Sequence, residues 1–168
     1  SVSVVEARSF PGAKTVSVVY AKQALDQLTS CAGVTAPSYS TLVMFENKKS
    51  SMSTYGDANS ITPPMMMAVA TVAGEVCNDL INQERALTTP RIFVGWNLAS
   101  TNLPAANDVA NAISRLAISC WSKQESAEER AEIQSLVASV QNGSANASQR
   151  SALLMCTAIL SSLKSLMN

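Results

Sequence analysis

The sequence contains no histidine. Because Ser-His-Asp and Cys-His catalysis, His-based metal sites and pH switches near neutrality all depend on imidazole, this absence excludes them. Charged residues are also scarce, at 14% of the chain, against about 25% in typical soluble domains. The 12 basic and 12 acidic residues cancel, so the chain lacks the excess positive charge that attracts nucleic acids and anionic membrane surfaces. We therefore expect no nucleic-acid partner and no membrane-surface partner.

Long hydrophobic runs and common catalytic motifs are missing as well. The apolar run Met65–Gly74 is far shorter than the roughly 20 residues that a bilayer requires, so we expect no membrane span. The cysteines form no CxxC pair, which removes the usual zinc, redox and haem-attachment spacings. Neither a GxSxG nucleophile elbow nor a glycine-rich phosphate loop is present. The sequence thus predicts a protein that is not an enzyme and that holds no cofactor or metal.

Four cysteines are present, and each lies on, or at the end of, an apolar helical stripe: Cys31, Cys77, Cys120 and Cys156. Interhelical disulfides and buried thiols would both occupy such positions. The composition, rich in Ala, Ser and Thr and poor in Lys, is typical of exported bacterial proteins and favours disulfides. Of the three pairings that four cysteines allow, we favour Cys31–Cys77 with Cys120–Cys156, which would tie neighbouring elements within each half of the chain.

The first 15 residues, SVSVVEARSFPGAKT, alternate small and β-branched residues before a Pro-Gly turn. This pattern indicates a short extended arm that pairs with a partner or packs on the body of the protein. A loose terminus is the alternative. The candidate contact residues in the arm are Ser1, Val2, Val4 and Phe10.

Beyond the arm, apolar residues recur at intervals of three and four, the period of amphipathic helices. Gly33 is a plausible helix end, Thr62 before Pro63 is a good helix start, and Ser126–Glu129 (SAEE) matches a capping box. The expected helices span residues 16–32, 37–47, 63–84, 105–123, 126–140 and 147–167, with a loop after residue 47. Short connections between such helices predict an all-α bundle of five or six helices in a single domain over residues 1–168.

Arg91–Leu98 (RIFVGWNL) is the most apolar and aromatic short run. Its periodicity does not decide between a brief strand and an irregular hydrophobic plug. Trp96, beside Gly95, is a further candidate contact residue, because indole rings often anchor interfaces.

The run Met65–Met67, with Cys77 on the same helix, raises the question of a Cu(I) site, since thioether and thiolate ligands suit that ion. Consecutive helical residues point about 100° apart, and Met67 and Cys77 are about 15 Å apart along the axis, so these groups do not converge. The methionines are expected to pack in the core or at a contact surface. Glu75 and Asp79, four residues apart beside Cys77, are a carboxylate pair that a hydrolase could use.

The C-terminal third contains RLAISCWSKQESAEERAEIQSL followed by QRSALLMCTAILSSLKSL. Over Arg115–Leu166 it resembles the helical tail of cytochrome-associated exported proteins of planctomycetes and related bacteria. Those tails accompany a haem-binding CxxCH segment, and this chain has neither that motif nor a histidine, so the resemblance carries over no haem or redox chemistry. What it implies is an exported helical domain.

The leading hypothesis is an exported, disulfide-stabilised helical domain that acts through protein–protein contact. It would be a non-enzymatic structural or assembly subunit of a bacterial envelope or extracellular complex, located in the periplasm, on the cell surface or in the medium. Its partners would be proteins, including copies of itself in a homo-oligomer or filament, because low net charge tolerates self-association. The alternative is a helical binding module with an apolar pocket lined by methionines and Trp96. A carboxylate-dependent hydrolase using Glu75 and Asp79 is the third hypothesis.

Overall fold

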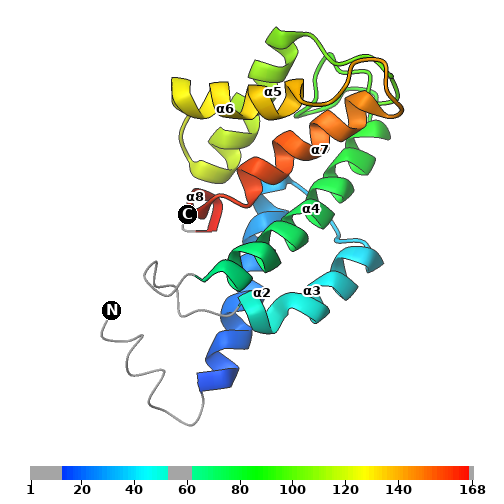
Figure 1. Cartoon of the computed structure of the whole chain (residues 1–168). Helices are drawn as coiled ribbons and strands as arrows, with labels where there is room; N and C mark the ends of the chain where they lie inside the picture. Colours follow the sequence, from blue (N-terminus) through cyan, green and yellow to red (C-terminus); the bar gives the residue numbers. More distant parts are fainter. Residues whose placement is uncertain (1–12, 53–61, 167–168) are drawn as a thin grey trace.

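The computed structural model describes residues 13–52 and 62–166, and all of the regular structure in these ranges is helical. Seven helices follow one another along the described chain: α2 (Ala13–Ala32), α3 (Tyr39–Met52), α4 (Pro63–Arg85), α5 (Ala106–Trp121), α6 (Ala127–Ala138), α7 (Ala147–Leu160) and α8 (Leu163–Leu166) (Figure 1). The all-α class predicted from the sequence is confirmed. The described helices exceed the expected five to six because the last predicted helix is divided in two.

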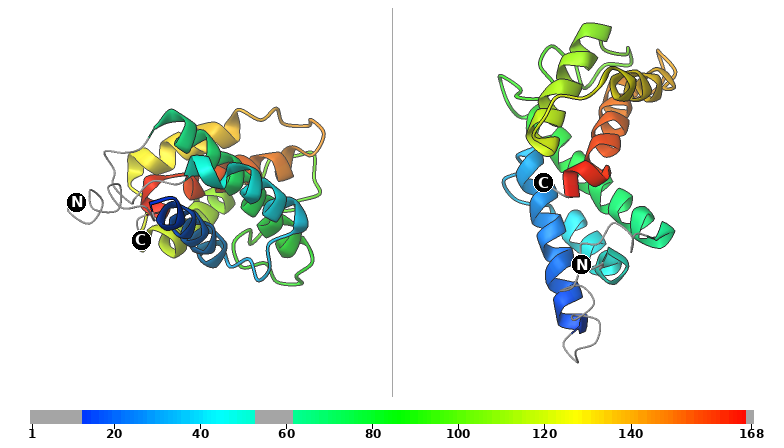
Figure 2. Two further views of the ribbon diagram at one scale, coloured as in Figure 1. Left: turned by 90° about the horizontal axis from the view of Figure 1, so that it is seen from below. Right: turned by 90° about the vertical axis from the view of Figure 1, so that its left-hand side faces the viewer.

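Helices α4 and α7 are central to the arrangement. α4 packs against α2, α3 and α7, and α7 packs in turn against α5, α6 and α8. Figures 1 and 2 show α2 and α3 beside one part of α4, with α5 and α6 gathered at the opposite end around α7. One hydrophobic cluster joins these helices, with members such as Leu28, Phe45, Leu80, Leu116 and Met155.

Helix α3 is longer than the sequence predicts. We expected a loop after Asn47, but the helix continues to Met52, whose side chain is buried. Lys49 pairs with Glu46 one turn earlier. Burial of the apolar Met52 side chain stabilises the final turn. Because Lys48–Ser51 are polar, the sequence predicted a loop there, whereas the segment is helical and is held by the buried residue that follows it.

The predicted helix over residues 147–167 is interrupted after Leu160. Ser161 caps α7, and α8 begins at Leu163. Trp121 and Ser165 both donate hydrogen bonds to the carbonyl of Ile159, at 3.2 and 2.7 Å. Because these side chains supply partners for the end of α7, the chain turns there and α8 packs against α2 and α5.

Arg91–Leu98 is the irregular plug and not a strand. Ile92, Phe93 and Leu98 are buried, and Phe93 meets Trp96 edge to face with ring centroids 5.0 Å apart. The plug is held by the carboxylate of Glu84 on α4, which accepts hydrogen bonds from the backbone N–H groups of residues 91, 92 and 93 at 2.6–3.0 Å.

Two disulfides join helices from opposite halves of the chain. Cys31 of α2 bonds to Cys120 of α5, and Cys77 of α4 bonds to Cys156 of α7. The four cysteines are thus disulfide-bonded as expected, but the favoured pairing, Cys31–Cys77 with Cys120–Cys156, is wrong. Although α2 and α4 pack together, Cys31 lies beside α5 and Cys77 lies on the side of α4 that meets α7. Proximity along the chain was a poor guide to which helix faces meet.

The expected N-terminal arm over Ser1–Thr15 lies largely outside the described residues. Its contact candidates Ser1, Val2, Val4 and Phe10 are all outside, and their roles stay predictions. The part that is described is not extended, since α2 already begins at Ala13. Residues 13–15, the last three of the predicted arm, are therefore helical.

Candidate interaction surface

The outer side of α3 exposes three large hydrophobic side chains in its first two turns. Tyr39 is 83% exposed, Leu42 is 45% exposed and Val43 is 40% exposed. They follow the i, i+3, i+4 spacing that places residues on one side of a helix. We call this surface, together with Glu46, Asn47 and Ser50 further along the same side, the α3 face.

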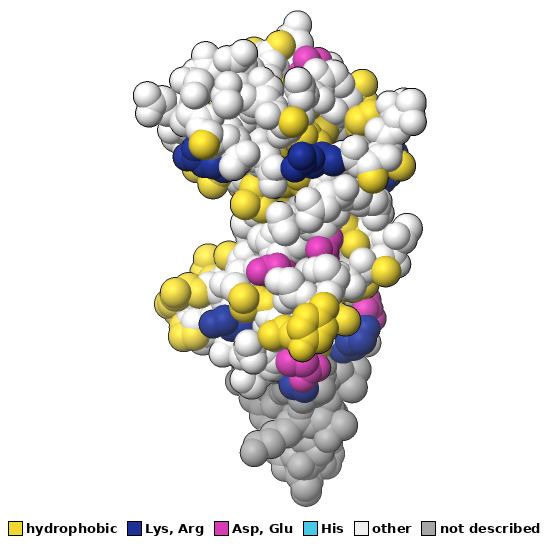
Figure 3. Space-filling model, turned by 90° about the vertical axis from the view of Figure 1, so that its right-hand side faces the viewer, with side chains coloured by type: hydrophobic (Ala, Val, Ile, Leu, Met, Phe, Trp, Pro, Cys, Tyr) yellow, Lys and Arg dark blue, Asp and Glu magenta, His cyan; other side chains and the backbone are white. Residues whose placement is uncertain are grey.

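Helix α3 is apolar on two sides, although among the described helices it packs on only one. Phe45 and Met52 are buried toward α2 and α4, while Tyr39, Leu42 and Val43 point away from the core. A helix at the edge of a soluble domain normally turns polar residues outward, so the apolar half of the α3 face departs from that pattern. Figure 3 shows hydrophobic side chains gathered on the part of the molecule where α3 lies.

A stripe of polar side chains on α4 fixes the start of α3 in place. Glu75, Asp79 and Gln83 are four residues apart and so share one side of α4. Asp79 Oδ2 accepts from the backbone N–H of Ser38 at 2.9 Å and from Thr41 Oγ1 at 2.6 Å. Glu75 Oε2 accepts from Ser40 Oγ at 3.0 Å. These bonds come from behind the helix and leave its outer side free.

The connection that leads into α3 is held by the same stripe. Gln83 Nε2 donates to the carbonyl of Gly33 at 2.8 Å, and its Oε1 accepts from the backbone N–H of Thr35 at 3.2 Å. Ser38 caps the helix, since its Oγ accepts from the N–H of Thr41 at 3.2 Å. The backbone that carries Tyr39, Leu42 and Val43 is therefore anchored by side chains more than 30 residues away in sequence.

The charge on the α3 face is paired. Glu46 is the acid among its residues, and its carboxylate lies 2.6 Å from the ammonium of Lys49. The face thus carries no strong net field, and its apolar half is next to a polar half on the same helix.

The predicted carboxylate pair has a structural role. Glu75 and Asp79 do lie together, as expected, but both bind the start of α3. Asp79 is buried, and so are Glu84 and Glu125; Glu84 holds the plug, and Glu125 accepts from Ser114 Oγ at 2.9 Å and Arg130 Nε at 2.8 Å. Each buried acid therefore has the hydrogen-bond partners that an acid removed from water requires.

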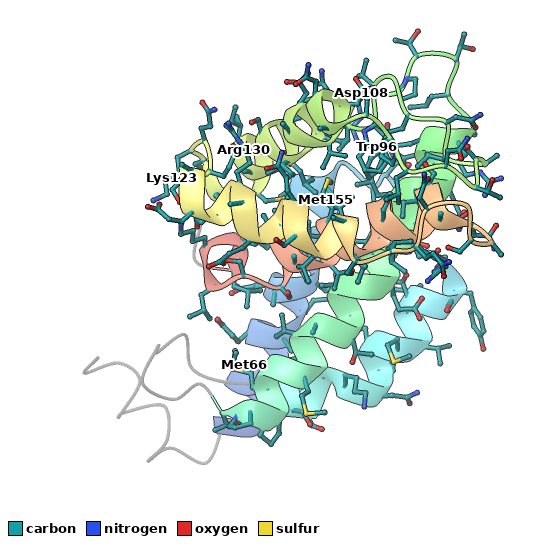
Figure 4. All side chains as sticks on the ribbon, turned by 45° about the horizontal axis from the view of Figure 1, so that its top comes forward. Met66, Trp96, Asp108, Lys123, Arg130 and Met155 are labelled. Carbon is teal, nitrogen blue, oxygen red and sulfur yellow. A yellow bond between two sulfur atoms is a disulfide. The ribbon has the colours of Figure 1, made fainter. Side chains whose placement is uncertain are left out.

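Trp96, the other predicted contact residue, is mostly buried. Only 8% of it is exposed, and its indole N–H donates to the carbonyl of Asp108 at 3.1 Å. Figure 4 shows the two residues close together, Trp96 on the plug and Asp108 on α5. One edge of Trp96 still lines an open groove, so a contact role for this edge stays a prediction.

The methionines divide between core and surface. Met65 is buried, whereas Met66 and Met67 are 58% and 71% exposed. Met66 lies at the opposite end of the α3–α4 pair from the start of α3 (Figure 4). Within the described chain, no cluster of three or more Cys, Asp or Glu side chains is arranged to hold a metal ion. No described helix has the length and hydrophobicity needed to cross a bilayer.

Three open grooves lie elsewhere on the described surface, and methionine lines none of these three. Their volumes are about 340, 450 and 370 Å³. The first, between α5 and α6, has apolar walls that include Leu103, Pro104, Val109 and Val137. The second lies beside the plug, and the third between α4 and α7.

The α3 face was not identified from the sequence. The apolar residues over 37–47 predict a helix, but they do not show which of its sides is covered. The sequence did contain the pattern that marks this face. Tyr39, Leu42 and Val43 have the spacing of one side of a helix, and the buried Thr41 and Phe45 have the spacing of another.

Comparison with known proteins gives no assignment. No protein-family model matches the chain. No curated protein and no solved structure is significantly similar to it.

Proposed function

We propose that this protein is a non-enzymatic assembly or structural subunit that binds another protein through the α3 face. The observation that carries this proposal is the 83% exposure of Tyr39 beside Leu42 and Val43 on a helix whose backbone is fixed from behind by α4. Exposed apolar side chains that occur together on one element indicate an interaction site.

The rigidity of α3 favours binding. A partner that docks on a flexible segment must offset the entropy lost when that segment becomes ordered. Here Asp79, Glu75 and Gln83 already order the first turns of the helix. The α3 face therefore offers aromatic and aliphatic contact area at low entropic cost, which is the property of interface anchor residues.

The proposed location is outside the cytosol. Disulfides persist in oxidising compartments, and all four cysteines are disulfide-bonded. The finer placement, in the periplasm, on the surface or in the medium of a bacterium, rests on the small, polar, lysine-poor composition and is part of the proposal. The alternative, a binding module with an apolar ligand pocket, stays a prediction and gains no support from the positions of the methionines.

The test uses a photo-reactive phenylalanine analogue in place of Tyr39, in cells that make the protein. We expect irradiation to give a discrete cross-linked product, and we expect Leu42→Gln in the same chain to abolish it. The matched control carries the probe at Leu136 on α6, which is 42% exposed and lies on a different helix. If the probes at Tyr39 and Leu136 give the same products, or neither gives any, the α3 face is not the binding site.

A further inference from the structure

We infer that the partner of the α3 face is a second copy of this chain, packed with the two α3 helices antiparallel about a two-fold axis between Leu42 and Val43. This inference rests on the proposed function and adds the identity and geometry of the partner. A two-fold contact of this kind uses the same surface on both copies and therefore has to be self-complementary.

The part of the α3 face from Tyr39 to Glu46 meets this requirement. The apolar residues of the face occupy the first two turns, and its polar residues Glu46, Asn47 and Ser50 follow on the same side. With the axis between residues 42 and 43, Leu42 of one copy packs against Val43 of the other. Tyr39 then lies opposite Glu46 of the second copy, where its hydroxyl can donate a hydrogen bond to the carboxylate. A parallel pairing would instead place tyrosine on tyrosine and glutamate on glutamate.

The electrostatics also favour two identical copies. The formal net charge of the chain is zero, so copies approach without long-range repulsion. Glu46 is already paired with Lys49, so the α3 face presents no unpaired carboxylate to a second copy. A strongly charged partner would find no complementary field on this face.

The position of α3 leaves room for a second helix. It packs on α2 and α4 within the molecule and lies at the edge of the described fold (Figures 1 and 2). With the axis between residues 42 and 43, only residues 39–46 of the two α3 helices overlap, over about 12 Å. The contact is therefore at the small end of specific interfaces, below about 1,200 Å² in total. The pair is therefore expected to be reversible, and a covalent trap is the appropriate assay.

The experiment compares two variants of the purified, oxidised protein, Val43→Cys and Leu136→Cys, each of which adds one cysteine to the four native ones. The native sites are 40% and 42% exposed, and the native cysteines are disulfide-bonded, so each variant offers one reactive thiol. A residue beside a two-fold axis lies close to the same residue of the second copy. We therefore expect a short bismaleimide to convert Val43→Cys to covalent dimer several-fold faster than Leu136→Cys. Adding Leu42→Gln to the Val43→Cys chain should remove this advantage.

Equal rates for the two variants would overturn self-pairing, as would an advantage of Val43→Cys that survives Leu42→Gln. Circular dichroism of each variant checks that the helices remain. The proposed function is judged separately by the Tyr39 probe in cells. A cross-linked product with a different protein would retain the binding role of the α3 face and reject the second copy, whereas a product of twice the chain mass supports both.

Discussion

Glu84 lies on the buried side of α4, with none of its surface exposed. A carboxylate in such a place needs strong hydrogen-bond donors to offset its lost hydration. The backbone N–H groups of Arg91, Ile92 and Phe93 supply them. Three successive N–H groups that converge on one anion hold the chain in a tight turn, and the hydrophobic side chains of the plug are thereby directed into the core.

Replacing Glu84 by Gln should therefore be costly. The amide would present an NH₂ group to backbone donors and would remove the charge that strengthens their bonds, so we expect a loss of about 3 kcal/mol in the free energy of unfolding. Urea unfolding followed by circular dichroism measures it. The matched control is Glu75→Gln on the same helix, where the amide oxygen can still accept from Ser40; we expect less than about 1 kcal/mol there. Similar losses in both variants would contradict this account of Glu84.

The role of Glu84 was not predictable from the sequence. Its partners are backbone groups, which every residue possesses, and they are brought to it by a turn that has no sequence signature. Thr62 and Ser126 differ in this respect, because their capping bonds are made within three residues. Thr62 accepts from the N–H of Met65, and Ser126 from that of Glu129, as the sequence predicted.

At the scale of the element, the N-terminal cap of α6 is predicted from local sequence and is also bound by a residue of another helix. Its predicted capping box is confirmed, with Glu129 accepting from the backbone N–H of Ser126 at 2.9 Å. The same carboxylate also pairs with Lys164 of α8, whose ammonium lies 4.9 Å from the centre of the Trp121 ring. Lys164 therefore links the start of α6 to the end of α5.

These contacts make the stability depend on pH in the acid range. The hydrogen bond from Lys164, followed by that from the Ser126 backbone, lowers the pKa of Glu129 from 4.5 to about 2. The unfolded chain then binds more protons than the folded one between these values, so this contribution is present above pH 4.5 and is lost as the pH falls toward 2. We expect Glu129→Gln to cost about 1 kcal/mol near neutrality and the difference from wild type to shrink below pH 4.5.

Urea unfolding at a series of pH values from neutrality to about 2 measures this difference. Glu128→Gln, an exposed neighbour in the same first turn, is the control, because it keeps the negative charge of Glu129 and both of its hydrogen bonds. A cost for Glu129→Gln that stays constant across the acid range would rule out the linkage.

The sequence predicted the helices of this protein better than it predicted where they end. The interiors of the helices follow from apolar spacing, and their existence was predicted correctly. The extension of α3 to Met52 and the break before α8 depend on Met52 and Trp121 meeting other helices. Local propensity does not contain such information, which is why these boundaries were misplaced.

At the scale of the whole molecule, the two disulfides are interleaved along the chain. One closes a separation of 89 residues and the other a separation of 79, and each joins the first half of the chain to the second. The sequence predicted the participants because buried cysteines lie on apolar stripes. It did not predict the pairs, since these depend on which sides of α2 and α4 turn toward α5 and α7. The α3 face was missed for a related reason, because periodicity marks both apolar sides of a helix without saying which one is covered.

Each of the two cross-links stabilises the fold by joining the first half of the chain to the second. Each typically contributes about 2–4 kcal/mol, and their sum is comparable to the about 5–15 kcal/mol by which a domain is stable. We expect the variant with all four cysteines changed to Ala to melt at least about 10 °C below wild type. The Cys31→Ala, Cys120→Ala double variant should lose about half as much, because the Cys77–Cys156 bond still ties the two halves of the chain. Thermal unfolding by circular dichroism measures these shifts, and mass spectrometry of an unreduced digest checks the pairs. A peptide linking Cys31 to Cys77, or unchanged melting of the four-cysteine variant, would show that the fold does not depend on these bonds.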